Sequence, residues 1–399
     1  MLRGLATTLA VWAVGFAALR LTIAGPEVCE APTQTAVEAS IDAAAAWLAV
    51  NQAEDGRFLY EFDRAAGRPS AEYNEVRHAG VTMSLYQLAA AGNPAYIDAA
   101  ERGLQRALGR LMRRDGWAAV ADHGWAAVAE DDGTAKLGAS ALLTAALVFR
   151  REATADPRYD ALAAELGRFL LLMQEPNGRM LAYWSPAYEG PVPDLTSRYY
   201  TGEAFWALTL LARTFPEERV WLDAARRTAR YLAAERDEAE GFAFAPWPDQ
   251  WAAYGFAELV QLAPLSDAEV AYLRSLAERF GILVRFDAQR GEDEVSTLFR
   301  GEGARGAGLG TWVEGLGALW RTALRDDRLA DLREPIAERA LCGAGLLVER
   351  QTTEAEAAGD PRLAGAWFRE DMTRMDDQQH ALSALLAARA ILSHPEGVP

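Results

Sequence analysis

The chain has 399 residues, of which 51% are hydrophobic and 24% are charged, and its formal net charge is -17 at pH 7. This composition supports a large folded core and excludes general disorder. It also excludes nucleic acid as the expected partner, because phosphate binding needs a basic surface. An acidic ligand is not excluded, since a local basic pocket can lie within an acidic surface.

The first 25 residues resemble an export signal. Arg3 precedes a mostly apolar stretch from Leu5 to Leu19, which is the order of charge and apolarity found in signal peptides and signal anchors. Pro26 obscures a cleavage site, so a cleaved signal, a single membrane anchor and a buried helix all stay open. Residues 26–34 read as a linker. We therefore expect a cell-envelope protein that is anchored in the membrane, periplasmic or secreted.

Two kinds of helix alternate over residues 35–392, and strand signals are poor. One kind is amphipathic with a charged face. The other is apolar nearly all round, as in "GASALLTAALVF" from Gly138 to Phe149. In chain order, the predicted pairs of an amphipathic and an apolar helix are 35–52 with 77–91, 94–113 with 136–150, 157–174 with 200–213, 218–235 with 250–262, 266–281 with 311–324, and 330–350 with 376–391. Residues 393–399 form a tail.

A helix without a polar face must be covered by protein on every side. The apolar helices therefore belong inside, and the amphipathic helices outside them. Six such pairs in strict alternation predict an all-α fold in which six helical hairpins close into a ring.

Several amphipathic helices are followed by a similar turn. Gln52, Gly56 and Phe58 have the spacing Q-x3-G-x-aromatic, and Gln174 and Gly178 repeat it with Met180 in the aromatic place. This turn resembles that of the terpene cyclase and prenyltransferase toroids. Over residues 35–392 the chain resembles the wider six-hairpin superfamily, which includes glycoside hydrolases, polysaccharide lyases and sugar epimerases. The resemblance implies an (α/α)6 toroid, but a fold does not fix a function.

Polar residues gather at the starts of the apolar helices, which meet at one cavity in such a ring. The acids there are candidates for catalysis, because glycoside hydrolysis needs two carboxyl groups across the scissile bond. Glu203 and Asp377 are preferred, since their surroundings are otherwise apolar. The alternative is that these acids only cap helices. The candidate catalytic residues are Glu203, Asp377, Glu314 and Asp249.

Aromatic side chains beside carboxylates are typical of sugar-binding clefts, because ring faces stack on sugars while polar groups fix hydroxyls. Lys136 is the only lysine of the chain, which suggests a need for a compact ammonium group. His78 is either a cavity acid/base or a hydrogen-bonded core histidine. The candidate substrate-binding residues are Arg77, His78, Lys136, Tyr199, Tyr200, Trp251, Trp312 and Gln379.

Neither a metal nor a cofactor is expected. Zinc needs several Cys or His ligands close together, and the four histidines are scattered along the chain. Cys29 and Cys342 lie far apart, and we expect Cys342 to be a buried free thiol rather than a disulfide partner.

The sequence thus predicts a protein that acts on a glycan with paired carboxylates, as a hydrolase, lyase or epimerase. Two alternatives remain. The first is a non-catalytic toroid that binds glycan or peptide, or that serves as a scaffold. The second is a terpenoid cyclase, which would need a D-x-D-D motif that Asp376-Asp377 matches poorly.

Overall fold

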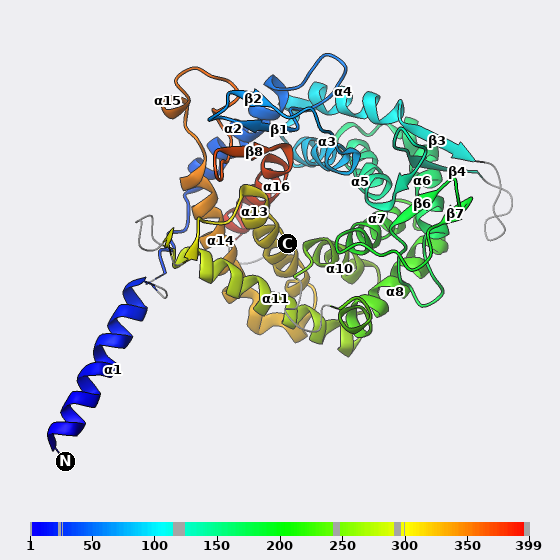
Figure 1. The fold of residues 1–399 in the computed structure, drawn as a ribbon. Helices are drawn as coiled ribbons and strands as arrows, with labels where there is room; N and C mark the ends of the chain where they lie inside the picture. The colour runs from blue at the N-terminus through cyan, green and yellow to red at the C-terminus, as the bar shows by residue number, and fades with distance from the viewer. Residues whose placement is uncertain are drawn as a thin grey trace.

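The computed structural model describes residues 2–22, 25, 27–114, 124–241, 248–290, 297–298 and 300–394. In this part of the chain, helices form a closed ring of two layers (Figure 1). The inner layer consists of α3 (Glu75–Ala90), α5 (Leu137–Thr154), α7 (Tyr200–Thr214), α10 (Gln250–Leu262), α13 (Gly306–Ala323) and α16 (Met375–Ser393). The outer layer consists of α2 (Gln34–Val50), α4 (Ile97–Leu108), α6 (Asp160–Leu172), α8 (Arg219–Ala234), α11 (Asp267–Ala288) and α14 (Arg333–Arg350).

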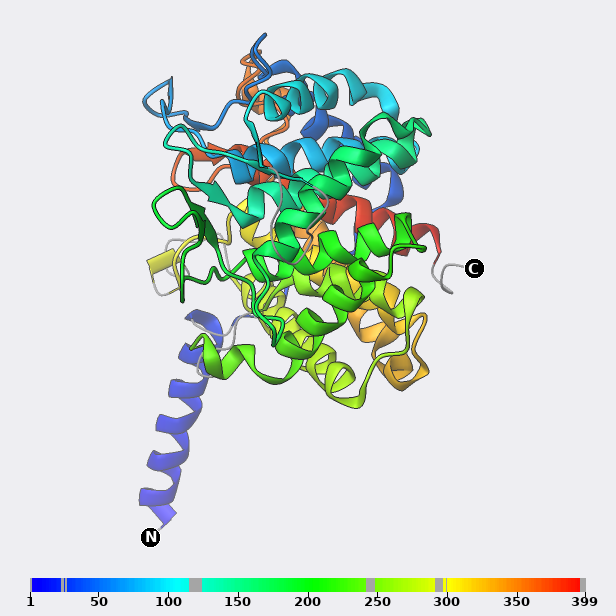
Figure 2. The ribbon, with the colours of Figure 1, turned by 90° about the vertical axis from the view of Figure 1, so that its right-hand side faces the viewer.

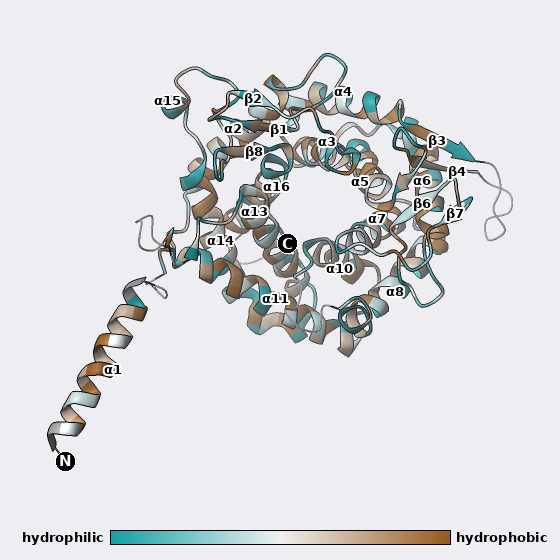
Figure 3. Cartoon of the chain, in the orientation of Figure 1, coloured by the Kyte–Doolittle hydropathy of each residue, from teal (hydrophilic) through white to brown (hydrophobic). Residues whose placement is uncertain are grey.

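The order of the layers follows from the apolar pattern. Each inner helix packs against the next one, and α16 packs back on α3. In α5, the run from Leu137 to Val148 is buried throughout. Outer helix α4 instead buries Ala100, Leu104 and Ala107 on one face, and Figure 3 shows hydrophilic and hydrophobic residues side by side on α8 and α11. The predicted alternation of inner and outer helices is confirmed.

Helix bounds differ from the prediction mainly in the fifth hairpin. Its outer helix α11 continues to Ala288, and its inner helix α13 begins at Gly306. The outer helices α4, α6 and α14 each start three residues later than predicted, because a 3-10 helix precedes each of them: η1 (Pro94–Tyr96), η2 (Pro157–Tyr159) and η3 (Asp327–Leu332). The predicted C-terminal tail begins inside α16, and residues 395–399 lie outside the described part of the chain.

Short strands join the loops at one end of the ring (Figure 2). They form sheets of order β2-β1-β8, β3-β4 and β5-β6-β7. Phe62 pairs with Thr373 and so connects the first hairpin to the sixth. These strands could not be predicted from the sequence, because segments of two to four residues are too short to show an alternating pattern. The strands are β1 (Glu61–Asp63), β2 (Arg68–Pro69), β3 (Leu111–Arg114), β4 (Trp125–Val128), β5 (Ala135–Lys136), β6 (Tyr183–Ser185), β7 (Gly190–Pro191) and β8 (Met372–Arg374).

Where it occurs, the repeated turn connects one outer helix to the next outer helix of the ring. The Gln52 amide donates to the carbonyl of Ala99 in α4 at 3.0 Å. Gly56 has φ +85°, and a Cβ there would lie 2.4 Å from the Arg102 carbonyl oxygen. Only glycine allows both the left-handed backbone and this close approach. The Q-x3-G-x-aromatic pattern is therefore explained by packing.

Similar turns, with a glutamine amide bonded to a neighbouring outer helix and a glycine at positive φ, occur elsewhere in the ring. The Gln174 amide donates to Ala224 of α8 at 2.9 Å, and Gly178 has φ +98°. After α14, the Gln351 amide donates to Ser40 of α2 at 3.1 Å, with Gly365 at φ +81°. This last copy joins the sixth hairpin to the first.

The N-terminal helix α1 (Leu2–Thr22) stands away from the ring (Figures 1 and 2). Its side chains from Gly4 to Arg20 are exposed, including Trp12 at 74%. Among the described residues, no helix combines the length and the apolar character needed to cross a membrane.

The expectation for the cysteines was wrong. Cys29 and Cys342 form a disulfide with a Cα–Cα distance of 4.8 Å. The segment predicted as a linker packs against two outer helices, because Val28 N donates to the Ala288 carbonyl at 2.9 Å and Glu30 lies against Gly345. This pairing could not be predicted from the sequence, because the two cysteines are 313 residues apart. They meet because closure of the ring places α14 next to the segment that precedes α2.

Candidate functional site

A cavity of about 790 Å³ opens where the inner helices begin. Helices α3, α7, α10, α13 and α16 each contribute residues from their first turns, and α11 adds a wall. Of the residues proposed from the sequence, the cavity is lined by Arg77, Tyr199, Tyr200, Glu203, Trp251, Trp312 and Gln379.

Aromatic rings pack together at this end of the inner layer. Trp251 stacks on Trp206 with ring centroids 5.5 Å apart, and Trp206 stacks on Tyr254 at 4.8 Å. The His380 ring lies 5.6 Å from Trp251. Trp312 and Tyr199 add further rings to the lining. The cavity therefore has flat apolar surfaces beside its polar groups.

Glu203 lies in the first turn of α7 and is 3% exposed. A Cβ at Gly138 would lie 2.2 Å from its Oε2, so the small glycine makes room for this carboxyl group. Oε2 has no hydrogen-bond partner among the residues described. Burial, with a further contribution from the Asp249 charge, raises the pKa of Glu203 well above its ordinary value. This setting favours the protonated acid.

Asp376 lies in the first turn of α16, and its environment differs from that of Glu203. Its Oδ2 lies 3.3 Å from Nε of Arg77, and its side chain is 17% exposed. Arg77 is held in turn by the Tyr60 hydroxyl, to which it donates at 2.6 Å. The Arg77 guanidinium thus places a positive charge next to this carboxyl group. The cavity therefore contains one carboxyl group in an apolar setting and one beside a cation.

His380, one turn further along α16, also lines the cavity. Its Nδ1 lies 2.7 Å from Oε2 of Glu314, which is buried behind it. Burial alone would lower the pKa of His380, but the Glu314 carboxylate raises it above the ordinary value. A carboxylate that orients one imidazole nitrogen leaves the other for acid/base chemistry.

Two of the proposed catalytic acids cap helices instead of lining the cavity. Asp377 accepts hydrogen bonds from the backbone N of Ala307 at 2.9 Å and of Arg374 at 3.1 Å. Asp249 caps α10 through the backbone N of Ala252 at 3.0 Å and pairs with the buried Arg236. Their proposed catalytic role receives no support, because the backbone and Arg partners already occupy both carboxylates.

Glu314, the remaining proposed acid, does not line the cavity, but it contacts His380, which does. His78 and Lys136 lie outside the lining. His78 bonds to the Tyr73 hydroxyl at 2.7 Å and to the Gly103 carbonyl at 2.8 Å, and burial lowers its pKa to about 4. It is a neutral core histidine. Lys136 precedes α5 and pairs with Glu130 at 2.8 Å, so neither residue supports the predicted role in substrate binding.

Several lining residues were missed from the sequence. They include Asp376, His380, Gln250 and Arg279. The signal was present in α16, because Asp376, Gln379 and His380 have the i, i+3, i+4 spacing of one helix face. Asp377 lies outside that set. Arg279 was missed because it lies on an outer helix, whereas cavity residues were expected only at the starts of the inner helices.

Within the described ranges, no group of three or more His, Cys, Asp or Glu side chains could hold a metal ion. The polar groups of the lining could instead hydrogen-bond to the hydroxyls of a ligand.

No model of a known protein family matches the sequence, and no curated protein matches it. Solved structures do match. The cellobiose 2-epimerase of Spirochaeta thermophila aligns with TM-score 0.58 and 16% identity, over 90% of this chain and 97% of its own. The α-1,6-mannanase of Salegentibacter sp. gives TM-score 0.57 and 15% identity, over 90% and 99%. A D-mannose isomerase gives TM-score 0.55 and 14% identity, over 89% and 97%.

The fold is an (α/α)6 toroid. The helical ring and its full-length alignment with these toroid enzymes confirm the predicted fold class and the predicted architectural resemblance. At such low identities, the alignments establish the fold and leave the reaction to be argued from the cavity.

Proposed function

We propose that the toroid is a carbohydrate-active enzyme that hydrolyses a glycosidic bond in the central cavity. The observation that carries this proposal is the contrast between Glu203 and Asp376, which line the same cavity in opposite environments. Glycosidases pair a protonated carboxyl group with an ionised one.

Glu203 is suited to be the general acid. Its raised pKa allows it to protonate the leaving oxygen as the glycosidic bond breaks. Asp376 is suited to be the ionised partner, either activating water or attacking the sugar directly. Arg77 holds Asp376 in place and keeps its charge balanced.

Aromatic side chains supply a platform for the sugar. Trp251, Trp312 and Tyr199 line the cavity, and Tyr199 is 42% exposed. Sugar rings present apolar C–H faces that pack on such rings, while hydroxyls take the adjacent polar groups. Gln379 and Gln250 can supply both donors and acceptors there. The volume of about 790 Å³ fits a short oligosaccharide.

The activities of the similar structures agree with a carbohydrate substrate. These proteins are a cellobiose 2-epimerase, an α-1,6-mannanase and a D-mannose isomerase. Another is an inactive variant of the same mannanase in complex with α-1,6-mannotriose. These activities belong to those proteins, and they guide the choice of substrates to be tested here.

A second candidate reaction is the epimerisation or isomerisation of a reducing sugar. His380 favours it, because an imidazole oriented by Glu314 at 2.7 Å is suited to move a proton at a carbon next to a carbonyl. In this case Glu203 would protonate the sugar oxygen and no glycosidic bond would break.

We also propose that the protein acts outside the cytosol. The disulfide between Cys29 and Cys342 supports this location, since disulfides persist mainly in oxidising compartments. The signal-like sequence before Pro26 agrees with it.

The experiment is a panel of manno- and gluco-oligosaccharides incubated with the full chain in H₂¹⁸O and in D₂O. Hydrolysis adds ¹⁸O to a shorter product, whereas epimerisation places deuterium on carbon without shortening the chain. Glu203→Gln and Asp376→Asn should each lower hydrolysis by about 10²-fold or more. Under the second reaction, His380→Gln should have the larger effect. Binding of a glycan without turnover, or turnover insensitive to all three changes, would exclude the proposed enzyme mechanism.

A further inference from the structure

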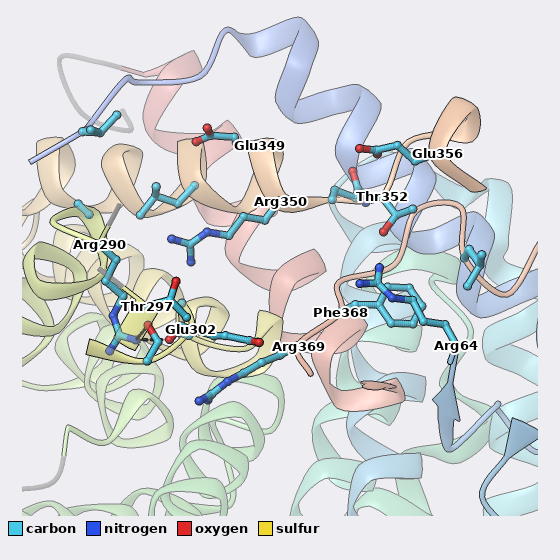
Figure 4. Close-up of a pocket in the computed structure, with 18 residues that line it drawn as sticks. Arg64, Arg290, Thr297, Glu302, Glu349, Arg350, Thr352, Glu356, Phe368 and Arg369 are labelled. Carbon is cyan, nitrogen blue, oxygen red and sulfur yellow. Dashed lines mark hydrogen bonds between the residues drawn. The ribbon is translucent and has the colours of Figure 1, made fainter. Parts of the chain in front are cut away.

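Figure 4 shows a second cavity, of about 730 Å³. It is formed by the ends of α11 and α14 and by the segment that leads into α13. Gly303 and Ala304 line this cavity, whereas Ala307 and Gly308 line the central one. The start of α13 therefore separates the two cavities.

Arginines dominate the interior of this cavity. Arg64, Arg290, Arg350 and Arg369 all line it. Figure 4 shows Arg350 reaching from α14 toward Arg290, with Arg369 on the opposite wall. Such a cluster is unexpected on a chain with a net charge of -17, because like charges repel unless an anion lies between them.

The acidic partners of this cluster are either shared or lie at its exposed edge. Asp287 is shared, since it pairs with Arg350 and also lies 3.4 Å from Arg290. Arg64 pairs with Asp371 at 2.8 Å and Arg369 with Glu370 at 3.6 Å, and the side chains of these two acids are 51% and 68% exposed. The Nε atoms of Arg290 and Arg369 are buried and have no hydrogen-bond partner among the described residues. Burial and the neighbouring guanidinium groups of Arg300, Arg369 and Arg350 lower the pKa of Arg290.

Three glutamates also line the cavity, but they are exposed. Glu356 is occupied by the backbone N of Thr353 at 2.8 Å, in a helix cap. Glu302 accepts from the backbone N of Glu370 at 3.1 Å. Figure 4 shows Glu349 on the side of α14 away from Arg369. The half-buried part of the cavity is therefore cationic.

We propose that this cavity binds an acidic sugar unit through its carboxylate, sulfate or phosphate group. Arginine side chains present forked donors that match such oxyanions. The Phe368 ring, with Arg64 4.7 Å from its centroid, offers a flat surface for the sugar itself. The volume accommodates one or two sugar units. Binding here is independent of catalysis in the central cavity.

The position of Arg350 depends on a glycine. A Cβ at Gly303 would lie 2.8 Å from Nη1 of Arg350. Gly303→Ala should therefore displace the guanidinium without changing any charge. This variant tests the arrangement of the arginines separately from their number.

The test measures binding by titration calorimetry of the full chain with four probes. These are a uronic-acid oligosaccharide, a sulfated oligosaccharide, a neutral oligosaccharide of equal length and inorganic phosphate. We expect an acidic oligosaccharide to bind at least tenfold more tightly than the neutral one, and Arg290→Gln and Arg369→Gln each to weaken it at least tenfold. The preferred acidic probe identifies the anion.

The matched control is Arg226→Gln, which removes an exposed arginine of α8 and should leave affinity unchanged. Circular dichroism melts confirm that each variant is folded, and Glu203→Gln should bind the acidic probe normally, which separates this site from the proposed reaction. Three results would overturn the proposal: equal binding of neutral and acidic probes, affinity that is the same in the arginine variants, or phosphate that binds as tightly as the best oligosaccharide.

Discussion

Buried carboxyl groups have different surroundings at the two ends of the inner layer. At the end where the inner helices begin, Glu203 Oε2 and Asp376 Oδ1 are buried without a hydrogen-bond partner among the described residues. At the other end lies a smaller cavity of about 290 Å³. There the buried Glu258 pairs with Arg213 at 2.6 Å and with Arg321 at 3.4 Å.

This contrast distinguishes carboxyl groups that stabilise the fold from carboxyl groups that are available to a ligand. A buried carboxyl group that is fully paired contributes to stability and has no capacity left for a ligand. One that is left unpaired costs stability, and such groups cluster where ligands bind. Variants at the two ends should therefore have opposite effects on activity and on stability.

The largest expected effect is on catalysis in the central cavity, at the end where the inner helices begin. Glu203→Gln should lower kcat by about 10²–10⁴-fold, because the amide cannot donate a proton to the leaving group. Its free energy of unfolding should not fall, and at neutral pH it should be higher than that of the wild type, because the amide removes the cost of burying a carboxyl group that has no partner for Oε2 among the described residues. Steady-state kinetics and urea unfolding measure the two quantities. A variant that loses activity only because it unfolds would contradict the assignment.

The next effect concerns the disulfide, which lies on the outside of the ring. Replacing both Cys29 and Cys342 by Ser should lower the free energy of unfolding by about 2–4 kcal/mol, because the unfolded chain gains freedom. Turnover in the central cavity should persist. Guanidinium unfolding with and without dithiothreitol measures this, and the double variant should show no response to the reductant. Equal stability of the wild type in both conditions would refute the prediction.

A smaller effect is expected at the opposite end. Glu258→Gln should lower the free energy of unfolding by about 1–2 kcal/mol, because two arginines lose their buried partner. Since Glu258 lies away from the central cavity, kcat should stay within about twofold of the wild type. Should this variant lose activity as strongly as Glu203→Gln, the contrast between the two ends would fail.

The last effect is a pH dependence of stability, which amounts to at most about 1.4 kcal/mol over any one pH unit. The pKa of Glu203 is raised in the folded state, so the folded chain holds this proton after the unfolded chain has released it. The contribution of Glu203 protonation to the free energy of unfolding is therefore greatest below pH 4.5, the ordinary pKa of this side chain. This contribution falls as the pH rises toward the pKa of Glu203 in the folded state. The limiting slope is about 1.4 kcal/mol per pH unit. Unfolding curves between pH 4.5 and 8 should be flatter for Glu203→Gln, and identical slopes would exclude this shift.

Much of the fold could be predicted from the sequence because its cause is local. An apolar segment such as Gly138–Phe149 needs cover on all sides wherever it lies, so periodicity alone assigned it to the inner layer. The bond between Cys29 and Cys342 could not be predicted in this way. It depends on the closure of the ring, which brings α14 back to residues 27–33.

The candidate site could be predicted only in part. The starts of the inner helices were the right place, and Glu203 lines the cavity as expected. Asp377 was preferred over Asp376 because of its apolar context, yet an apolar context equally suits a buried cap. Which of two adjacent carboxylates faces a cavity depends on the rotation of the helix. The i, i+3, i+4 spacing of Asp376, Gln379 and His380 carries that information.

The disulfide also determines how a mechanical load would pass through the molecule. A pull on α1 reaches Cys29 before it reaches α2, and the covalent bond transfers it to Cys342 in the middle of α14. Helix α2 and the turn at Gln52 that ties it to α4 then carry little of the tension. Stretching α1 would strain one outer helix and leave the catalytic end of the ring unloaded, unless the sulfur–sulfur bond is reduced first.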